Sequence, residues 1–131
     1  MSDGPFLNAL LLCSKVVVEN KQLRIEGIQN WTRDVQLGQK GDLVLFVAIY
    51  GGALRGPTPF RIRLETPSGQ ESWHPFKHDF GDSPVVSNLV GFQAISIPIT
   101  ISETGVYWFE VLHEEKLLGR APWRVSLPGE P

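Results

Sequence analysis

The segment His74-Pro75-Phe76-Lys77-His78-Asp79 is the one grouping in the sequence with the side chains of a metal site. Two imidazoles and a carboxylate can bind zinc. However, Pro75 disturbs a strand, the spacing is not that of a helical i, i+4 pair, and the remaining histidine, His113, lies in a distant turn. We therefore expect a solvated loop here. A metal-dependent hydrolase that uses His74 and His78 is the least favoured of the functions considered.

Nucleophilic chemistry has equally little support in the sequence. The only cysteine, Cys13, lies inside an apolar run, where a thiol behaves as a small inert hydrophobe. No Gly-x-Ser-x-Gly elbow is present, and no glycine-rich phosphate loop leads into a helix. The sequence thus predicts that the protein is not an enzyme, with no cofactor and with no catalytic, cofactor-binding or metal-binding residues.

The elements that would position any functional side chain are all expected to be strands. Short apolar or alternating runs are separated by turn residues, and no long stretch has helical periodicity. The pattern predicts an all-β fold, an immunoglobulin-like β-sandwich of about seven to nine mostly antiparallel strands. Residues 28–37 are expected to cross irregularly, residues 66–69 to form a hairpin turn and residues 77–84 a polar loop. The expected strands are 7–18, 23–26, 43–50, 60–65, 70–76, 92–101, 105–112 and 117–127.

Three of these strands have more specific predictions. Residues 43–50 are apolar at every position, as in a strand that is central in its sheet or buried on both faces. In residues 60–65, Phe60, Ile62 and Leu64 alternate with charged residues and should face the core. Pro98 within residues 92–101 indicates a sheet edge or a bulge.

The pattern Gly105-Val106-Tyr107-Trp108-Phe109 is the most informative local signal. In immunoglobulin-type domains a tyrosine at this point bonds through its hydroxyl to the backbone at the sheet corner. Tyr107 is in that register, and Phe109 occupies the position of the second core cysteine. We favour this structural role over a catalytic role for Tyr107.

Outward-facing residues are the candidates for binding. If Tyr107 and Phe109 point inward, Trp108 must point to the opposite face, as an aromatic anchor for a partner or a sugar. A covering loop such as residues 28–37 is an equally weighted alternative, since tryptophan is mostly buried. Trp73 and Trp123 are expected in the core. The candidate contact residues are Trp108, Arg61, Arg63 and Trp31.

Composition predicts one domain over residues 1–131, with an ordered core of about residues 6–127. The net charge is -2, and the pairs Arg61/Arg63 and Arg120/Arg124 are too sparse in sequence to indicate nucleic-acid binding. The single cysteine excludes an intrachain disulfide. Residues 7–18 lack a preceding basic region and are too short to span a bilayer. These features predict a cytoplasmic protein with no membrane partner, in which the sequon at Asn30 has no glycosylation role.

Four segments resemble a family of uncharacterised bacterial proteins that contain an immunoglobulin-like domain of unknown function. The resemblance covers about Ala9 to Leu127, implies the fold and carries no mechanism. Ser14 stands where the family commonly has an acidic residue, so no role of that carboxylate transfers. The segments are Ala9-Leu10-Leu11-Leu12-Cys13-Ser14-Lys15-Val16-Val17-Val18 with the ensuing Leu23, Ile25 and Gly27-Ile28; Pro59 to Gly69; Gly105 to Val111; and Leu118 to Val125.

The favoured function is a non-enzymatic protein-interaction or scaffolding module, with a protein partner or a second copy of the chain in a homodimer. The alternative is a small-ligand module of carbohydrate type, which would stack a sugar ring on Trp31 or Trp108.

Overall fold

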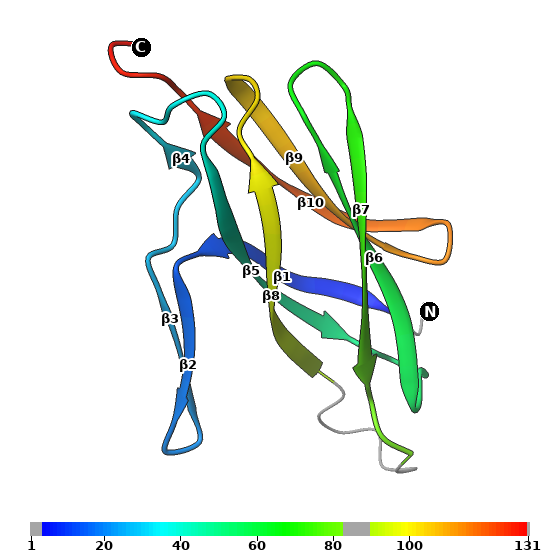
Figure 1. The fold of residues 1–131 in the computed structure, drawn as a ribbon. Coiled ribbons are helices and arrows are strands. Elements are labelled where there is room, and N and C mark those ends of the chain that lie inside the picture. The colour runs from blue at the N-terminus through cyan, green and yellow to red at the C-terminus, as the bar shows by residue number, and fades with distance from the viewer. Residues whose placement is uncertain (1–3, 83–89, 131) are drawn as a thin grey trace.

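The computed structural model describes residues 4–82 and 90–130, and these two ranges contain ten β-strands (Figure 1). Within them no helix is long and apolar enough to cross a membrane. The strands are β1 (Phe6–Cys13), β2 (Lys15–Glu19), β3 (Gln22–Glu26), β4 (Trp31–Thr32), β5 (Lys40–Tyr50), β6 (Pro57–Glu65), β7 (Glu71–Asp79), β8 (Val90–Thr100), β9 (Gly105–His113) and β10 (Lys116–Val125).

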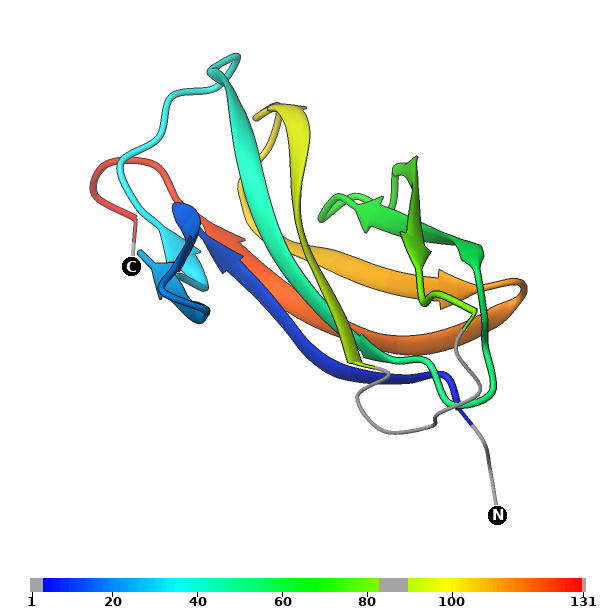
Figure 2. The same cartoon turned by 90° about the horizontal axis from the view of Figure 1, so that it is seen from below.

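Two sheets form the body of the molecule (Figure 1, Figure 2). One sheet has the order β1-β5-β8 and the other the order β4-β10-β9-β6-β7. All pairs are antiparallel except β4 with β10, which is parallel. The early part of the chain contributes β1 to one sheet and β4 to the other, and the later strands cross between the sheets as in immunoglobulin-like sandwiches. The predicted fold class is confirmed.

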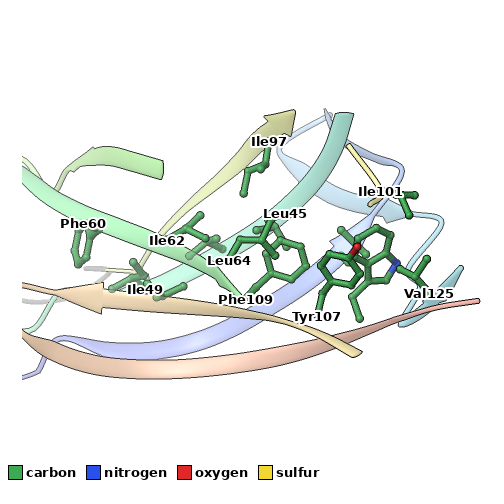
Figure 3. Close-up of a cluster of buried hydrophobic side chains, with 14 of the residues drawn as sticks. Leu45, Ile49, Phe60, Ile62, Leu64, Ile97, Ile101, Tyr107, Phe109 and Val125 are labelled. Atoms are coloured by element: carbon green, nitrogen blue, oxygen red, sulfur yellow. The ribbon is translucent and has the colours of Figure 1, made fainter. Parts of the chain in front are cut away.

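The core lies between the facing sides of the two sheets (Figure 3). Phe60, Ile62 and Leu64 of β6 are buried, as the alternation predicts. In β5, residues 45–49 are all buried, because this strand is central in its sheet and its outer side is covered as well. The prediction from its uninterrupted apolar run is confirmed.

The tyrosine corner is present at the start of β9. The Tyr107 hydroxyl donates a hydrogen bond to the carbonyl oxygen of Glu103 at 2.7 Å, and burial raises the pKa of this hydroxyl. Its ring packs against Trp123, with 5.1 Å between the centroids. Phe109 lies beside them in the core, as expected for the position of the missing cysteine.

The expected first strand, residues 7–18, is wrong as a single element. The chain leaves the sheet at Ser14, and β2 and β3 form a separate two-stranded hairpin that projects from the sandwich (Figure 1). Asn20 and Lys21 both have positive φ, which suits the tight turn that joins β2 to β3. The apolar run conceals the break because Val16 of the hairpin packs on the outer side of β5, in a cluster with Cys13 and Phe46. The apolar character of the run therefore continues across the break.

Smaller differences concern strand ends and prolines. β7 continues to Asp79, so residues 77–79 belong to a strand, while part of the expected loop 77–84 lies outside the described residues. β10 runs through Gly119 and Pro122 with a register shift between Leu117 and Gly119. Pro98 lies in β8, at the edge of its sheet, as predicted.

Candidate functional site

The outer face of the five-stranded sheet carries tryptophan and arginine side chains. Each of the five strands contributes at least one of them, and Arg33, which directly follows β4, adds another. Strands in a sheet lie nearly 5 Å apart, so this surface is about 20 Å wide. We call it the tryptophan–arginine face and define it by Trp31, Arg33, Arg61, Arg63, Trp73, Trp108, Arg120 and Arg124.

Strand alternation places these residues on one side of the sheet. In β9, Tyr107, Phe109 and Val111 are buried, so Trp108 and Glu110 project outward. In β10, Trp123 and Val125 are buried, so the even-numbered Arg120 and Arg124 project outward. The same rule orients Arg61 and Arg63 in β6. All four predicted contact residues, Trp108, Arg61, Arg63 and Trp31, therefore lie on one surface.

A guanidinium group lies over each outward indole ring. Arg33 and Arg124 lie over Trp31, with 3.6 and 4.3 Å from the guanidinium carbon to the ring centroid. Arg120 lies 4.2 Å from the centre of Trp108. Such contacts attract a cation to the negative face of the ring and restrain both side chains.

At the other side of the face, Trp73 lies under two arginines. Arg61 is 4.5 Å from the ring centroid and Arg63 is 5.9 Å from it. Trp73 is 42% exposed, so the expectation of a core position is wrong. Its strand, β7, is at the sheet edge, where no further strand of the described residues pairs with it.

Arg63 is neutralised by carboxylates on three strands. It binds Glu110, which is only 6% exposed, through Nε and Nη2. It also lies 3.3 Å from Glu71 and 3.9 Å from Glu65, which are directly opposite each other in the β6–β7 register. The positive charge of Arg63 offsets the repulsion between these two carboxylates, and the surrounding carboxylates, Glu110 foremost, raise the pKa of Arg63.

Three other arginines have no such compensation. Within residues 4–82 and 90–130, no carboxylate lies within ion-pair distance of Arg33, Arg61 or Arg120. Arg61 donates a hydrogen bond to the backbone carbonyl oxygen of Glu114, and this oxygen carries no formal charge. The face is thus locally positive around these groups, although the whole chain has a net charge of -2.

This grouping corrects one step of the sequence argument. The pairs Arg61/Arg63 and Arg120/Arg124 are far apart in sequence, but β6, β9 and β10 bring both pairs to the same surface. The basic residues are therefore clustered, with Glu65, Glu71 and Glu110 interleaved among them.

Trp108 and Trp31 are half-buried, and Trp123 is fully buried in the core as expected. Trp31 Nε1 donates a hydrogen bond to Ser126 Oγ at 3.0 Å, and Trp123 Nε1 donates one to Thr32 Oγ1 at 2.8 Å. In the short strand β4, the Trp31 side chain therefore points outward and the Thr32 side chain points inward. No sequence signal identifies β4, because it is two residues long and pairs only with the end of β10.

The histidine segment lies elsewhere, on the inner side of β7. His74 contacts Ser72 and His78 contacts Gln93, and Phe76 separates the two histidines on the strand. Among the described residues no three potential ligands come together to hold a metal ion. Burial lowers the pKa of His74. Cys13 is buried, as expected, and burial raises the pKa of its thiol.

Sequence reasoning missed Trp73, Arg33, Arg120 and Arg124 as members of the face. Strand alternation does place Glu110 on the same side of its strand as Trp108 and Leu112, but no role was predicted for it. Arg120 had no sequence signal, since its position opposite Glu110 depends on the register of β10 after the bulge at Leu117/Gly119.

Comparisons with known proteins add a structural likeness. No family model matches the sequence, and no curated protein matches it. Among solved structures, an immunoglobulin-like protein from Pseudomonas aeruginosa is similar at 15% identity and a TM-score of 0.45, over 93% of this chain and 96% of that chain. The assignment of an immunoglobulin-like sandwich therefore rests on the strand order and the tyrosine corner of this chain itself.

Proposed function

We propose that this protein is a non-enzymatic interaction module that binds another protein through its tryptophan–arginine face. The observation that carries the proposal is the set of guanidinium groups over Trp31, Trp73 and Trp108, spread from one edge of the five-stranded sheet to the other. Tryptophan and arginine are the residues most enriched among those that dominate binding energy at protein interfaces.

The stacking itself favours binding. A long arginine side chain normally loses rotamer entropy when a partner immobilises it, at a cost of about 0.5–1.5 kcal/mol per side chain. Arg61 and Arg120 are already held over Trp73 and Trp108, so part of that loss has occurred before the partner arrives. A β-sheet also supplies a more rigid base for these side chains than a loop would.

A partner different from this chain is favoured over a homodimer through this face. In a two-fold dimer the same patch contacts itself. Arg33, Arg61 and Arg120 of both copies would then lie within one interface, while the carboxylates nearby are already in contact with Arg63. Like charges facing each other across an interface oppose association.

The test is quantitative capture from cell lysate with three baits: wild type, Trp73→Ala/Trp108→Ala and the control Phe92→Ala. Phe92 is 44% exposed on the other sheet, which matches Trp73 in exposure. We expect proteins that wild type and Phe92→Ala enrich and the double variant loses. Trp73→Ala alone provides a variant of an exposed residue if the double variant does not fold. Equal recovery by all baits contradicts the proposal.

A carbohydrate-type ligand remains the second candidate, because Trp73 is well exposed. Arginines already lie over all three outward rings, however, and sugar stacking requires an open ring face. Tryptophan fluorescence titrated with a panel of sugars separates the two functions. A saturable change with one sugar, absent in Trp73→Ala, would favour the carbohydrate function.

We further propose that the chain belongs to the uncharacterised bacterial family that its sequence resembles, and that it acts in the cytoplasm. The single cysteine, Cys13, and the tyrosine corner at Tyr107 support this assignment. Fractionation of the native cell, followed by immunodetection, tests the location, and recovery outside the cytoplasm contradicts it.

A further inference from the structure

We infer that the partner contributes an acidic segment, whose carboxylates bind the stacked arginines of the tryptophan–arginine face; this inference rests on the proposed interaction function. Arg33, Arg61 and Arg120 have no carboxylate within ion-pair distance among the described residues, whereas Arg63 nearby has three. The face therefore offers positive charge that the chain itself does not neutralise.

The donor chemistry of the arginines supports a carboxylate ligand. A guanidinium has five N–H donors in a planar fork, and contact with the face of an indole is not a hydrogen bond and does not by itself occupy all of these donors. Arg120 over Trp108 therefore retains donors that a planar acceptor can bind in a bidentate manner. Carboxylates have this geometry. A guanidinium group is more weakly hydrated than an ammonium group, which lowers the cost of removing its water on binding.

The spacing fits an extended chain. Arg120 is opposite Glu110, Glu110 is opposite Arg63, and Arg61 is two residues from Arg63 along β6. Strand geometry then puts the Cα atoms of Arg61 and Arg120 about 12 Å apart. On an extended peptide, side chains four residues apart are about 13 Å apart on the same side, so two acidic residues can meet both arginines.

Interleaved acidic groups favour a protein segment over a nucleic acid. Glu110 on β9 lies between the arginines of β6 and those of β10, and Glu65 and Glu71 lie beside Arg63 on β6 and β7. A phosphate backbone is continuously charged, so it would approach these carboxylates as well as the arginines. A peptide can instead place its charges only opposite Arg61 and Arg120.

The test uses three dye-labelled probes in fluorescence anisotropy: a 12-residue peptide with glutamate at every fourth position and threonine elsewhere, the same peptide with glutamine for glutamate, and a 12-nucleotide oligothymidylate. We expect wild type to bind the glutamate peptide at least about tenfold more tightly than the glutamine peptide, because charge-assisted bonds are lost in the latter. The oligothymidylate should bind more weakly than the glutamate peptide.

Two matched variants then locate the binding. Arg61→Gln/Arg120→Gln should reduce affinity for the glutamate peptide by about tenfold or more. Lys15→Gln/Lys21→Gln changes the net charge equally on the exposed β2–β3 hairpin and should leave affinity within about twofold. Thermal unfolding of each variant establishes that it is folded.

The inference is overturned if the two peptides bind equally, if neither binds, if the oligothymidylate binds most tightly, or if both double variants lose affinity alike. The lysate capture separates this failure from failure of the proposed function. If partners depend on Trp73 and Trp108 but are retained by Arg61→Gln/Arg120→Gln, the interaction function stands and the acidic segment does not. If no partner depends on Trp73 and Trp108, both fail.

Discussion

Glu110 and Arg63 illustrate how single residues support the tryptophan–arginine face. Glu110 is a nearly buried carboxylate in the middle of the sheet, and Arg63 is the side chain that binds it. The same guanidinium lies near Glu65 and Glu71 and faces Trp73, so one arginine connects β9, β6 and β7. Its positive charge offsets part of the negative charge of these three carboxylates, whereas Arg33, Arg61 and Arg120 have no carboxylate within ion-pair distance among the described residues.

Replacing Arg63 should therefore cost more stability than an ordinary surface substitution. Arg63→Met leaves Glu110 buried without its partner, and we expect a loss of about 2–3 kcal/mol in the free energy of unfolding. Arg63→Met/Glu110→Leu should recover most of that loss, because no charge is then left buried. Chemical denaturation of the two variants and of Glu110→Leu measures the coupling. If the loss in the double variant equals the sum of the losses in Arg63→Met and Glu110→Leu, the two side chains are not coupled and the account is contradicted.

His74 gives a prediction for pH. Burial lowers its pKa below the ordinary value of 6.5, so the folded protein favours the neutral ring. As the pH falls below about 6.5, the unfolded chain binds the proton more readily than the folded protein does, and stability decreases. Wild type should lose more stability between pH 7.5 and 5.5 than His74→Gln does, as measured by urea denaturation. An equal loss of stability in both proteins would show that His74 does not contribute to the pH dependence.

At the scale of elements, the β2–β3 hairpin is the least supported part of the described chain. It pairs with neither sheet, and at its tip Val18 is 60% exposed. Two-stranded hairpins are marginally stable by themselves in water. The hairpin is held at its base, where Val16 and Ile25 pack near Cys13 and Phe46, and where Ser14 donates a backbone hydrogen bond to Glu26.

Amide hydrogen exchange should reveal this difference between elements. The backbone amides of β2 and β3 open locally and should exchange far faster than those of β5 and β9, which have paired strands on both sides. Exchange followed by mass spectrometry or NMR gives the comparison directly. Equal protection of the hairpin and of β5 would mean that the hairpin is part of the cooperative core.

The return of the chain from the hairpin depends on Gly27. Its φ is +68°, and a Cβ atom there would lie 2.7 Å from Ser14 Cβ and 2.2 Å from Ser14 Oγ. Gly38 also has a positive φ, +87°, but has open space around it. Gly38→Ala should cost only the backbone strain, about 1 kcal/mol, and Gly27→Ala clearly more.

Thermal or urea unfolding of the two alanine variants measures this difference. Equal destabilisation would show that the contact with Ser14 relaxes freely and does not constrain the hairpin.

The sequence predicts well those elements whose side-chain pattern is local. The alternation in residues 60–65, the apolar run at residues 43–50 and the corner at Tyr107 all depend on neighbouring residues, and all three predictions are confirmed. The break at Ser14 was missed because both sides of it are apolar and both are packed. The local pattern of apolar residues is the same for a strand that packs on the outside of a sheet and for a strand that is hydrogen-bonded within it.

At the scale of the whole molecule, local sequence pattern predicts only part of the tryptophan–arginine face. Trp108, Arg61 and Arg63 were predicted to project outward, and strand alternation is sufficient for that in β6 and β9, whereas Trp31 was named only as a candidate contact residue. Their assembly on one surface depends on the sheet order, which places β9 between β6 and β10. Long-range strand order has no local signature, so the addition of Trp73 and Arg120 could not be predicted.

The two outer surfaces of the sandwich differ in chemistry, and this difference makes the interaction proposal specific. The outer side of the three-stranded sheet is apolar around Phe46 and Cys13 and is partly covered by the β2–β3 hairpin. The outer side of the five-stranded sheet carries the stacked arginines. A partner that recognises the second surface should leave the first one accessible.

Hydroxyl-radical footprinting of the protein with and without its captured partner tests this claim most directly. Trp73 and Phe92 are exposed to nearly the same extent, 42% and 44%, on opposite sheets, so each is the control for the other. The account predicts that the partner protects Trp73 from oxidation and leaves Phe92 as reactive as before. Protection of Phe92 with Trp73 unchanged would contradict it.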